Sequence, residues 1–227
     1  MKRAYFVTGT DTGIGKTFVS CALLAKFAHQ GLRAVGMKPV AAGCRSVADK
    51  LVSDDVEQLL AAGNVAATPE EVNPYAFEPP IAPHLAARQV GVKIELDRIA
   101  QHLTALQEKA DVVIVEGIGG FCVPLNDSQS TADMAITLGL PVILVVGMRL
   151  GCLNHALLTY QAIQHTGLPF AGWVANCISP DMQELQKNIA ALESLLPTPC
   201  IATLPLHDPA QAEWNYLPHT IGLKLPA

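Results

Sequence analysis

The sequence predicts an α/β fold in which a mostly parallel sheet carries helices on both faces. Short apolar runs rich in β-branched residues are typical of buried strands, and they occur at residues 4–8, 34–39, 112–116, 142–146 and 170–175. Longer segments with helical periodicity separate these runs. Strands that alternate with helices usually pair in parallel and form a three-layer structure. We expect one domain over residues 1–227, because a chain of this length with 50% hydrophobic residues can bury one large core.

The expected helices follow the strands along the chain. Residues 17–29 form an apolar helical segment, and leucine and isoleucine recur at three- and four-residue steps between Leu96 and Leu106. Further helices are expected at about 154–165 and 182–195. Prolines concentrate at 73–83, which we expect to be a surface excursion, and from 197 to the end, which we expect to be irregular.

Composition excludes several classes of function. The net charge of -5 and the absence of a basic run argue against nucleic-acid binding. The six cysteines show neither a CxxC pair nor the spacing of a zinc site, so we expect buried thiols in a reducing compartment. The first residues lack the apolar core of a signal peptide, and the longest apolar stretch, 141–148, is too short to cross a bilayer. We therefore expect a cytoplasmic protein that does not bind membranes.

The most informative motif is GTDTGIGKT at residues 9–17, between a predicted strand and a predicted helix. Backbone N–H groups at the start of a helix bind phosphate, Lys16 is placed to reach the terminal phosphates, and Thr17 to bind magnesium. The strict phosphate-loop pattern has glycine where this chain has Thr10. The motif predicts a P-loop NTPase-like fold that binds ATP with Mg²⁺.

Acidic residues suited to magnesium follow two of the predicted strands. Glu116 ends the run DVVIVEG, at the sheet edge where parallel strands present ligand-binding groups. Asp54 and Asp55 lie at the predicted start of a helix, where capping of the helix is at least as good an interpretation as metal binding.

Three further polar sites lie at the ends of predicted elements. Lys38 follows the second strand in GMKPV, where it is suited to stabilising a transferring phosphoryl group or an anionic substrate, although strand-end lysines are more often surface charges. Gly151–Asn154 precede a helix, so Asn154 is suited to be an N-cap and the nearby N–H groups to bind a carboxylate. The amide of Asn176 is suited to reading a base such as adenine.

Taken together, these motifs resemble dethiobiotin synthetase, a family of biotin synthesis. The matching segments span about three quarters of the chain, in the family's order. The resemblance rests most on GTDTxxGKT, on RLGCLNHALLT and on GWVAN. The segments are YFVTGTDTGIGKT (5–17), GMKPVAAG (36–43), VNPYAFEPPIAPH (72–84), VIVEGIGGF (113–121), PVILVVGMRLGCLNHALLT (141–159) and GLPFAGWVANCI (167–178).

The resemblance implies a homodimer and a particular reaction. In that family 7,8-diaminopelargonate, CO2 and ATP give dethiobiotin, ADP and phosphate. One amine captures CO2 as a carbamate, the carbamate oxygen attacks the γ-phosphate, and the second amine closes the ring on the mixed anhydride. The protein supplies positioning and positive charge, and no protein nucleophile is needed.

The resemblance also implies roles for individual residues, by motif match. It makes Lys38, Lys16 and Thr12 catalytic. It places Mg²⁺ on Thr17, Asp55 and Glu116, with Asp55 preferred to Asp54 because it keeps the family's distance from the KP motif. The implied ATP-binding residues are Gly13, Ile14, Gly15, Lys16, Thr17, Phe18, Asp55, Glu116, Gly117, Gly119, Asn176, Cys177, Pro205, Leu206 and His207, and the implied substrate-binding residues are Lys38, Ala42, Gly151, Cys152, Leu153 and Asn154, the last four across the dimer interface.

The chain departs from the family pattern at several positions. Ala42 and Ala82 replace residues that commonly carry a hydroxyl, and the segment after Pro209 matches poorly.

The alternatives to a dethiobiotin synthetase are a partner-regulated switch ATPase, a small-molecule kinase and an amide-forming ligase related to cobyrinate amidation. Lys38 and GCLNHALL have no task in the first, and the last would need a glutaminase unit for which the chain has no room.

Overall fold

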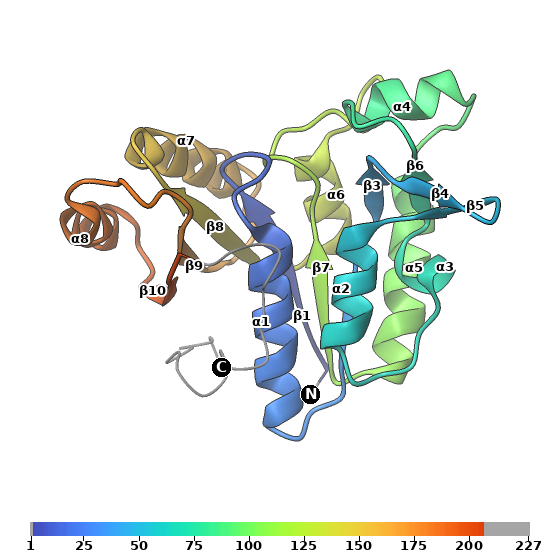
Figure 1. Cartoon of the computed structure of the whole chain (residues 1–227), viewed down its shortest axis with the longest axis horizontal. Coiled ribbons are helices and arrows are strands. Elements are labelled where there is room, and N and C mark those ends of the chain that lie inside the picture. The colour runs from blue at the N-terminus through green and yellow to red at the C-terminus, as the bar shows by residue number, and fades with distance from the viewer. Residues whose placement is uncertain (1, 207–227) are drawn as a thin grey trace.

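The computed structural model describes residues 2–206, and its centre is a six-stranded, entirely parallel sheet (Figure 1). The strand order is β10-β9-β8-β1-β7-β2, so β1, which leads into the phosphate loop, lies inside the sheet. The strands are β1 (Arg3–Gly9), β2 (Ala34–Met37), β7 (Val112–Glu116), β8 (Val142–Met148), β9 (Phe170–Cys177) and β10 (Cys200–Leu204).

Helices cover both faces of this sheet, as the sequence predicts (Figure 1). On one face, Tyr5 and Val7 pack in a core with α1 (Lys16–His29) and α2 (Asp54–Ala62). On the other face, Phe6 belongs to a second core that is completed by α5 (Leu96–Lys109), α6 (Thr131–Leu138), α7 (Cys152–His165) and α8 (Leu185–Leu195). Because successive residues of a strand point to opposite faces, a continuous apolar run supplies both cores. The fold is a three-layer α/β structure.

Smaller elements form beside the edge strand β2. Strands β3 (Val40–Ala42) and β6 (Tyr75–Phe77) pair in parallel, and β4 (Arg45–Val47) and β5 (Lys50–Val52) form an antiparallel hairpin. Two short helices, α3 (Pro69–Val72) and α4 (Pro83–Gln89), flank β6. The expectation of a surface excursion at 73–83 was wrong for β6, because the side chains of Tyr75 and Phe77 are buried in the core.

The C-terminal part of the described chain also differs from expectation. The region from residue 197 was expected to be irregular, but β10 joins the sheet and buries Ile201 and Leu204. The helix expected from about 182 begins only at Leu185, after Glu184 in a left-handed conformation. The strand expected to reach Pro39 ends at Met37, which leaves Lys38 just beyond the sheet.

No helix among residues 2–206 is long and apolar enough to cross a membrane. Of the six cysteines, all of which are free thiols, Cys21, Cys44, Cys152 and Cys177 are buried as expected. Cys122 is exposed and Cys200 is partly exposed, so the expectation of burial was wrong for Cys122.

Gly172 of β9 lies so close to β10 that only glycine fits at this position. Its φ is +142°, and an added Cβ would lie 2.6 Å from Ile201. We therefore expect Gly172→Ala to lower the free energy of unfolding by about 2–3 kcal/mol, from strain and overpacking together. Urea denaturation measures this change.

Gly31→Ala is the matched control, because Gly31 also has a positive φ, +79°, but no atom lies within 4 Å of the added Cβ. In Gly31→Ala the free energy of unfolding should fall by only about 1 kcal/mol, the cost of the left-handed conformation for alanine. An equal loss in the two variants would show that the contact with Ile201 is unimportant.

Candidate active site

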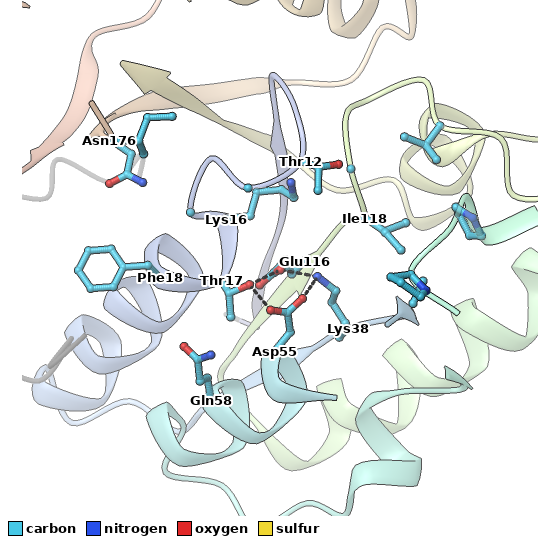
Figure 2. Close-up of a pocket in the computed structure, with 18 of the residues that line it drawn as sticks. Thr12, Lys16, Thr17, Phe18, Lys38, Asp55, Gln58, Glu116, Ile118 and Asn176 are labelled. Carbon is cyan, nitrogen blue, oxygen red and sulfur yellow. Dashed lines mark hydrogen bonds and ion pairs between the residues drawn. The ribbon is translucent and has the colours of Figure 1, made fainter. Parts of the chain in front are cut away.

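A cavity of about 1000 Å³ opens at the carboxyl edge of the sheet (Figure 2). The loops after β1, β2, β7, β9 and β10 contribute to it, together with α2 and the segment before α4. Its lining residues are Thr12, Gly13, Gly15, Lys16, Thr17, Phe18, Lys38, Ala42, Asp55, Gln58, Pro80, Ile81, Ala82, Pro83, Glu116, Ile118, Gly119, Val123, Asn176, Cys177, Ile178 and Leu206.

The phosphate loop connects β1 to α1 with two glycines in the left-handed region. Gly13 has φ +72° and Gly15 has φ +83°, and a Cβ on Gly15 would lie only 2.2 Å from Nδ2 of Asn176. Lys16 begins α1, is only 7% exposed, and donates from Nζ to the carbonyl oxygen of Asp11 at 2.8 Å. The lysine side chain therefore folds back over the loop.

Lys38 lies at the centre of a buried ionic cluster (Figure 2). Its Nζ is 2.5 Å from Oε1 of Glu116 and 2.6 Å from Oδ2 of Asp55. The hydroxyl of Thr17 lies within donating distance of both acids, 2.8 Å from Oδ1 of Asp55 and 2.9 Å from Oε1 of Glu116. Lys38 and Glu116 are buried and Asp55 is partly exposed, so the cluster forms the floor of the cavity.

Together, burial and these contacts raise the pKa of Lys38 and lower the pKa values of Asp55 and Lys16. Burial lowers the pKa of Lys38, but the carboxylates of Glu116 and Asp55 outweigh burial and raise this pKa above its ordinary value. Burial raises the pKa of Asp55, but the charge and hydrogen bond of Lys38 outweigh burial and lower it. Burial and the neighbouring charge of Lys38 lower the pKa of Lys16 to about 8. The surroundings therefore favour the charged form of Lys38 and disfavour the charged form of Lys16.

The oxygens of the cluster fit a magnesium ion. Mg²⁺ prefers hard oxygen ligands and is usually held by one or two carboxylates together with phosphates and water. Thr17, Asp55 and Glu116 supply such oxygens, and Oε2 of Glu116 is buried without a hydrogen-bond partner among the described residues. Residues 2–206 contain no cluster of three or more His, Cys, Asp or Glu side chains that would indicate an all-protein metal cage.

Asn176 lies at the far side of the cavity from Lys38 (Figure 2). Its side chain is fully buried, and Nδ2 donates to the carbonyl oxygen of Ile14 at 2.7 Å. Oδ1 is buried and has no hydrogen-bond partner among the described residues, so an acceptor remains for a ligand.

Most of the predicted site residues line this cavity. Exceptions are Ile14, which is buried beneath the loop, Gly117, Pro205, and the segment Gly151–Asn154. His207 lies outside the described residues. The predicted N-cap Asn154 was wrong, because Gly151, with φ +94°, is the N-cap of α7 and Asn154 lies within its first turn. Likewise, Ser53 rather than either aspartate occupies the N-cap position of α2.

The sequence did not indicate several lining residues. Gln58 faces the cavity because it lies three residues after Asp55 on α2, and that helical spacing is the signal that would have revealed it. Pro80, Ile81, Ile118 and Ile178 give the cavity apolar walls, and as ordinary apolar residues of loops they carry no sequence signal.

Fold and site together define a class of protein. In this parallel sheet, β1 leads through a glycine-containing loop into a helix that begins with lysine and threonine, and a glutamate ends the neighbouring strand. This arrangement is typical of P-loop proteins that bind nucleoside triphosphates. A family model described as an AAA domain matches residues 3–213.

Curated relatives narrow the class to one family. The chain is 54% identical to the ATP-dependent dethiobiotin synthetase of Nitrosospira multiformis, over 90% of this chain and 89% of that protein. It is 51% identical to the enzyme of the same name from Aromatoleum aromaticum, over 92% of this chain and 94% of that protein. The chain belongs to the ATP-dependent dethiobiotin synthetase family.

Solved structures share the fold at low sequence identity. The septum site-determining protein MinD from Pyrococcus horikoshii, solved with Mg-ADP, matches with a TM-score of 0.56 at 17% identity, over 96% of this chain and 86% of that one. A ParA family ATPase from Chlorobium tepidum also has a TM-score of 0.56, at 13% identity, over 98% and 91% of the two chains. These likenesses support the three-layer P-loop fold and nothing more specific.

The ionic cluster should contribute to the free energy of unfolding. Lys38→Met removes the cation that neutralises the buried carboxylate of Glu116, so we expect the free energy of unfolding to fall by about 3–5 kcal/mol. The double variant Lys38→Met/Glu116→Gln should recover part of this loss, because no buried charge is left unpaired at that position. Urea denaturation at constant pH measures both changes.

Lys109→Met is the matched control, since Lys109 pairs with Glu71 on the surface. We expect it to cost less than about 1 kcal/mol. If the double variant were no more stable than Lys38→Met alone, the buried pair would not be the source of the effect.

Proposed function

We propose that this chain catalyses the ATP-dependent carboxylation and ring closure of 7,8-diaminopelargonate with CO2, giving dethiobiotin, ADP and phosphate. The observation that carries the proposal is Lys38, a buried ammonium that contacts Glu116 and Asp55 beside Thr17 of the phosphate loop. The curated relatives that match about nine tenths of this chain are named ATP-dependent dethiobiotin synthetase.

Lys38 and Lys16 supply the positive charge that the reaction needs. A carbamate and a triphosphate repel each other, so bringing the carbamate oxygen to the γ-phosphate requires cations on both sides of the reacting atoms. Lys16 serves the phosphates from the loop, and Lys38 serves the carbamate from the end of β2. Because its two carboxylate partners raise the pKa of Lys38, we expect this residue to act as a positive charge that binds and orients the carbamate.

Mg²⁺, when bound, neutralises phosphate charge and favours departure of ADP. We assign it to Thr17, Asp55 and Glu116, whose oxygens converge beside the loop. Lys38 contacts both of these acids as well.

The cavity orients the nucleotide. Asn176 and Phe18 lie at one side, Lys38 lies at the other, and Lys16 and Thr17 lie between them (Figure 2). We place the base near the free Oδ1 of Asn176, which suits the amino group of adenine, and the γ-phosphate toward Lys38. Leu206 and Cys177 line the base side as well, whereas Ala42 lines the cavity without a hydroxyl.

We infer that recognition of the substrate carboxylate involves a second copy of the chain. Gly151–Asn154 do not line this chain's cavity, although their N–H groups begin α7 and suit a carboxylate. We infer a homodimer in which this segment serves the partner's site. Leu150, which is 99% exposed, and Leu158 on α7 give this region an apolar surface that supports the dimer. Sedimentation velocity distinguishes a dimer from a monomer.

Two coarser expectations accompany this function. We infer that residues 1–227 form one catalytic domain, which a single cooperative unfolding transition would support. We also infer a cytoplasmic location, where ATP and reduced thiols are available, and fractionation of cells that produce the protein tests it.

The direct test is product formation by purified protein. Diaminopelargonate, labelled bicarbonate and Mg-ATP should give labelled dethiobiotin with one ADP per product. Lys38→Gln should abolish turnover because the carbamate loses its cation, while ATP binding measured by calorimetry changes by less than about threefold.

Each outcome distinguishes a function. ATP hydrolysis without labelled product in the unaltered protein would refute the synthetase and favour a switch ATPase. Equal loss of turnover and of ATP binding in Lys38→Gln, at a temperature where the variant is folded, would move Lys38 into the nucleotide site.

The depressed pKa of Lys16 makes ATP binding depend on pH. In the nucleotide-free protein Lys16 has a pKa of about 8, and bound phosphates favour its charged form. Above pH 8, binding must therefore take up a proton, and ATP affinity should fall as pH rises from about 8 to about 9.5. Calorimetry in two buffers with different ionisation enthalpies measures the uptake. Lys16→Arg stays charged, so it should lose this dependence; an unchanged pH profile would assign the proton elsewhere.

A further inference from the structure

Asp11 places a carboxylate inside a loop that binds anions. Its side chain lies between Thr10 and Thr12 in the phosphate loop, where an uncompensated negative charge would repel a triphosphate. The guanidinium of Arg149 contacts this carboxylate, with Nη2 2.6 Å from Oδ2. The two residues are 138 positions apart in the sequence, so the fold brings them together from neighbouring strands β1 and β8.

Asp11 also determines where its neighbours in the loop lie. Its Oδ1 accepts from the backbone N–H of Thr12 at 2.7 Å, and its carbonyl oxygen accepts from Nζ of Lys16 at 2.8 Å. The Thr12 N–H is the largest cause of the lowered pKa of Asp11; burial opposes it, and Arg149 and the more distant His155 contribute further lowering. A displacement of Asp11 therefore moves both residues that the reaction assigns to the phosphates.

Arg149 is anchored to the rigid part of the fold. It directly follows Met148, the last residue of β8, and its carbonyl oxygen accepts from the N–H of Cys152 at 3.0 Å, in the first turn of α7. Arg149 and Asp11 are not among the residues that line the cavity. The contact between Arg149 and Asp11 therefore lies outside the cavity lining, and both side chains are partly exposed to solvent.

We propose that Arg149 is a positioning residue for the phosphate loop: it neutralises and holds the carboxylate of Asp11, so that Lys16 and Thr12 face the triphosphate in a field without an opposing charge. The inference rests on the proposed function in taking a nucleoside triphosphate as the ligand. It also ties the loop to the start of α7, the segment proposed to receive substrate in the partner's site.

A double-mutant cycle on Mg-ATP affinity tests the proposal, with calorimetry as the readout. Arg149→Met should weaken binding by about fivefold at low salt, a change typical of a partly exposed ion pair. Asp11→Asn alone should change affinity by less than about twofold. This variant removes the negative charge that repels the phosphates, and it leaves Arg149 no charge to neutralise. The double variant Asp11→Asn/Arg149→Met should bind within about twofold of the unaltered protein.

Two further variants separate positioning from a merely structural role. Arg149→Lys keeps the charge, so it should recover most of the affinity lost in Arg149→Met. Raising the salt concentration should shrink the loss in Arg149→Met, because screening weakens repulsion between Asp11 and the phosphates. Arg33→Met is the matched control, since Arg33 pairs with Asp111 at 2.8 Å at the amino-terminal edge of the sheet, away from the cavity, and ATP affinity should not change.

The outcomes that overturn the proposal are specific. If Arg149→Met costs as much in the Asp11→Asn background as it does in the unaltered protein, Arg149 acts on the nucleotide directly and the proposal falls. It also falls if Arg149→Met has no effect, or if its loss is independent of salt. Because the readout is binding, failure to form dethiobiotin would refute the proposed function and leave this inference standing, whereas product formation without coupling in the cycle would refute this inference alone.

Discussion

The buried contact between Lys38 and Glu116 is the constraint around which the site is built. A lone ammonium or carboxylate is costly to bury, so neither side chain is tolerable here without the other. Glu116 ends β7 and Lys38 follows β2, so their contact also requires these neighbouring strands to keep their parallel register. Asp55 and Thr17 then attach α2 and α1 to the same point. One charge pair thus joins both strands to both helices of one face.

The parts of the fold that were predictable are those with local signals. Strands such as β7 and β8 are continuous apolar runs, and α1 follows a glycine-containing turn, so periodicity and turn chemistry indicated them. The strand β10 was missed because its proline-rich flanks suggested a loop, while its stability comes from pairing with β9. The strand β6 is only three residues long and is formed by burial of Tyr75 and Phe77, a tertiary effect that no short window shows.

The candidate site shows the same division. Lys16, Thr17 and Glu116 stand at fixed distances from recognisable strand ends, so the sequence indicated them. Spacing alone left Asp55 divided between a cap and a ligand, because only folding shows that it points toward Lys38 while Ser53 occupies the cap position. The contact of Asp11 with Arg149 joins segments that are 138 positions apart in the sequence, and it had no sequence signal.

The strand order has a consequence for the length of the ligand. Asn176 belongs to β9, the phosphate loop follows β1, and Lys38 follows β2, so four inter-strand steps separate the two ends of the cavity. Neighbouring strands lie about 4.8 Å apart, which makes this span about 19 Å. Backbone hydrogen bonds fix each step, and the sheet therefore works as a ruler. A ligand that contacts both Asn176 and Lys38 must therefore extend across this whole distance, whatever side chains line the path between them.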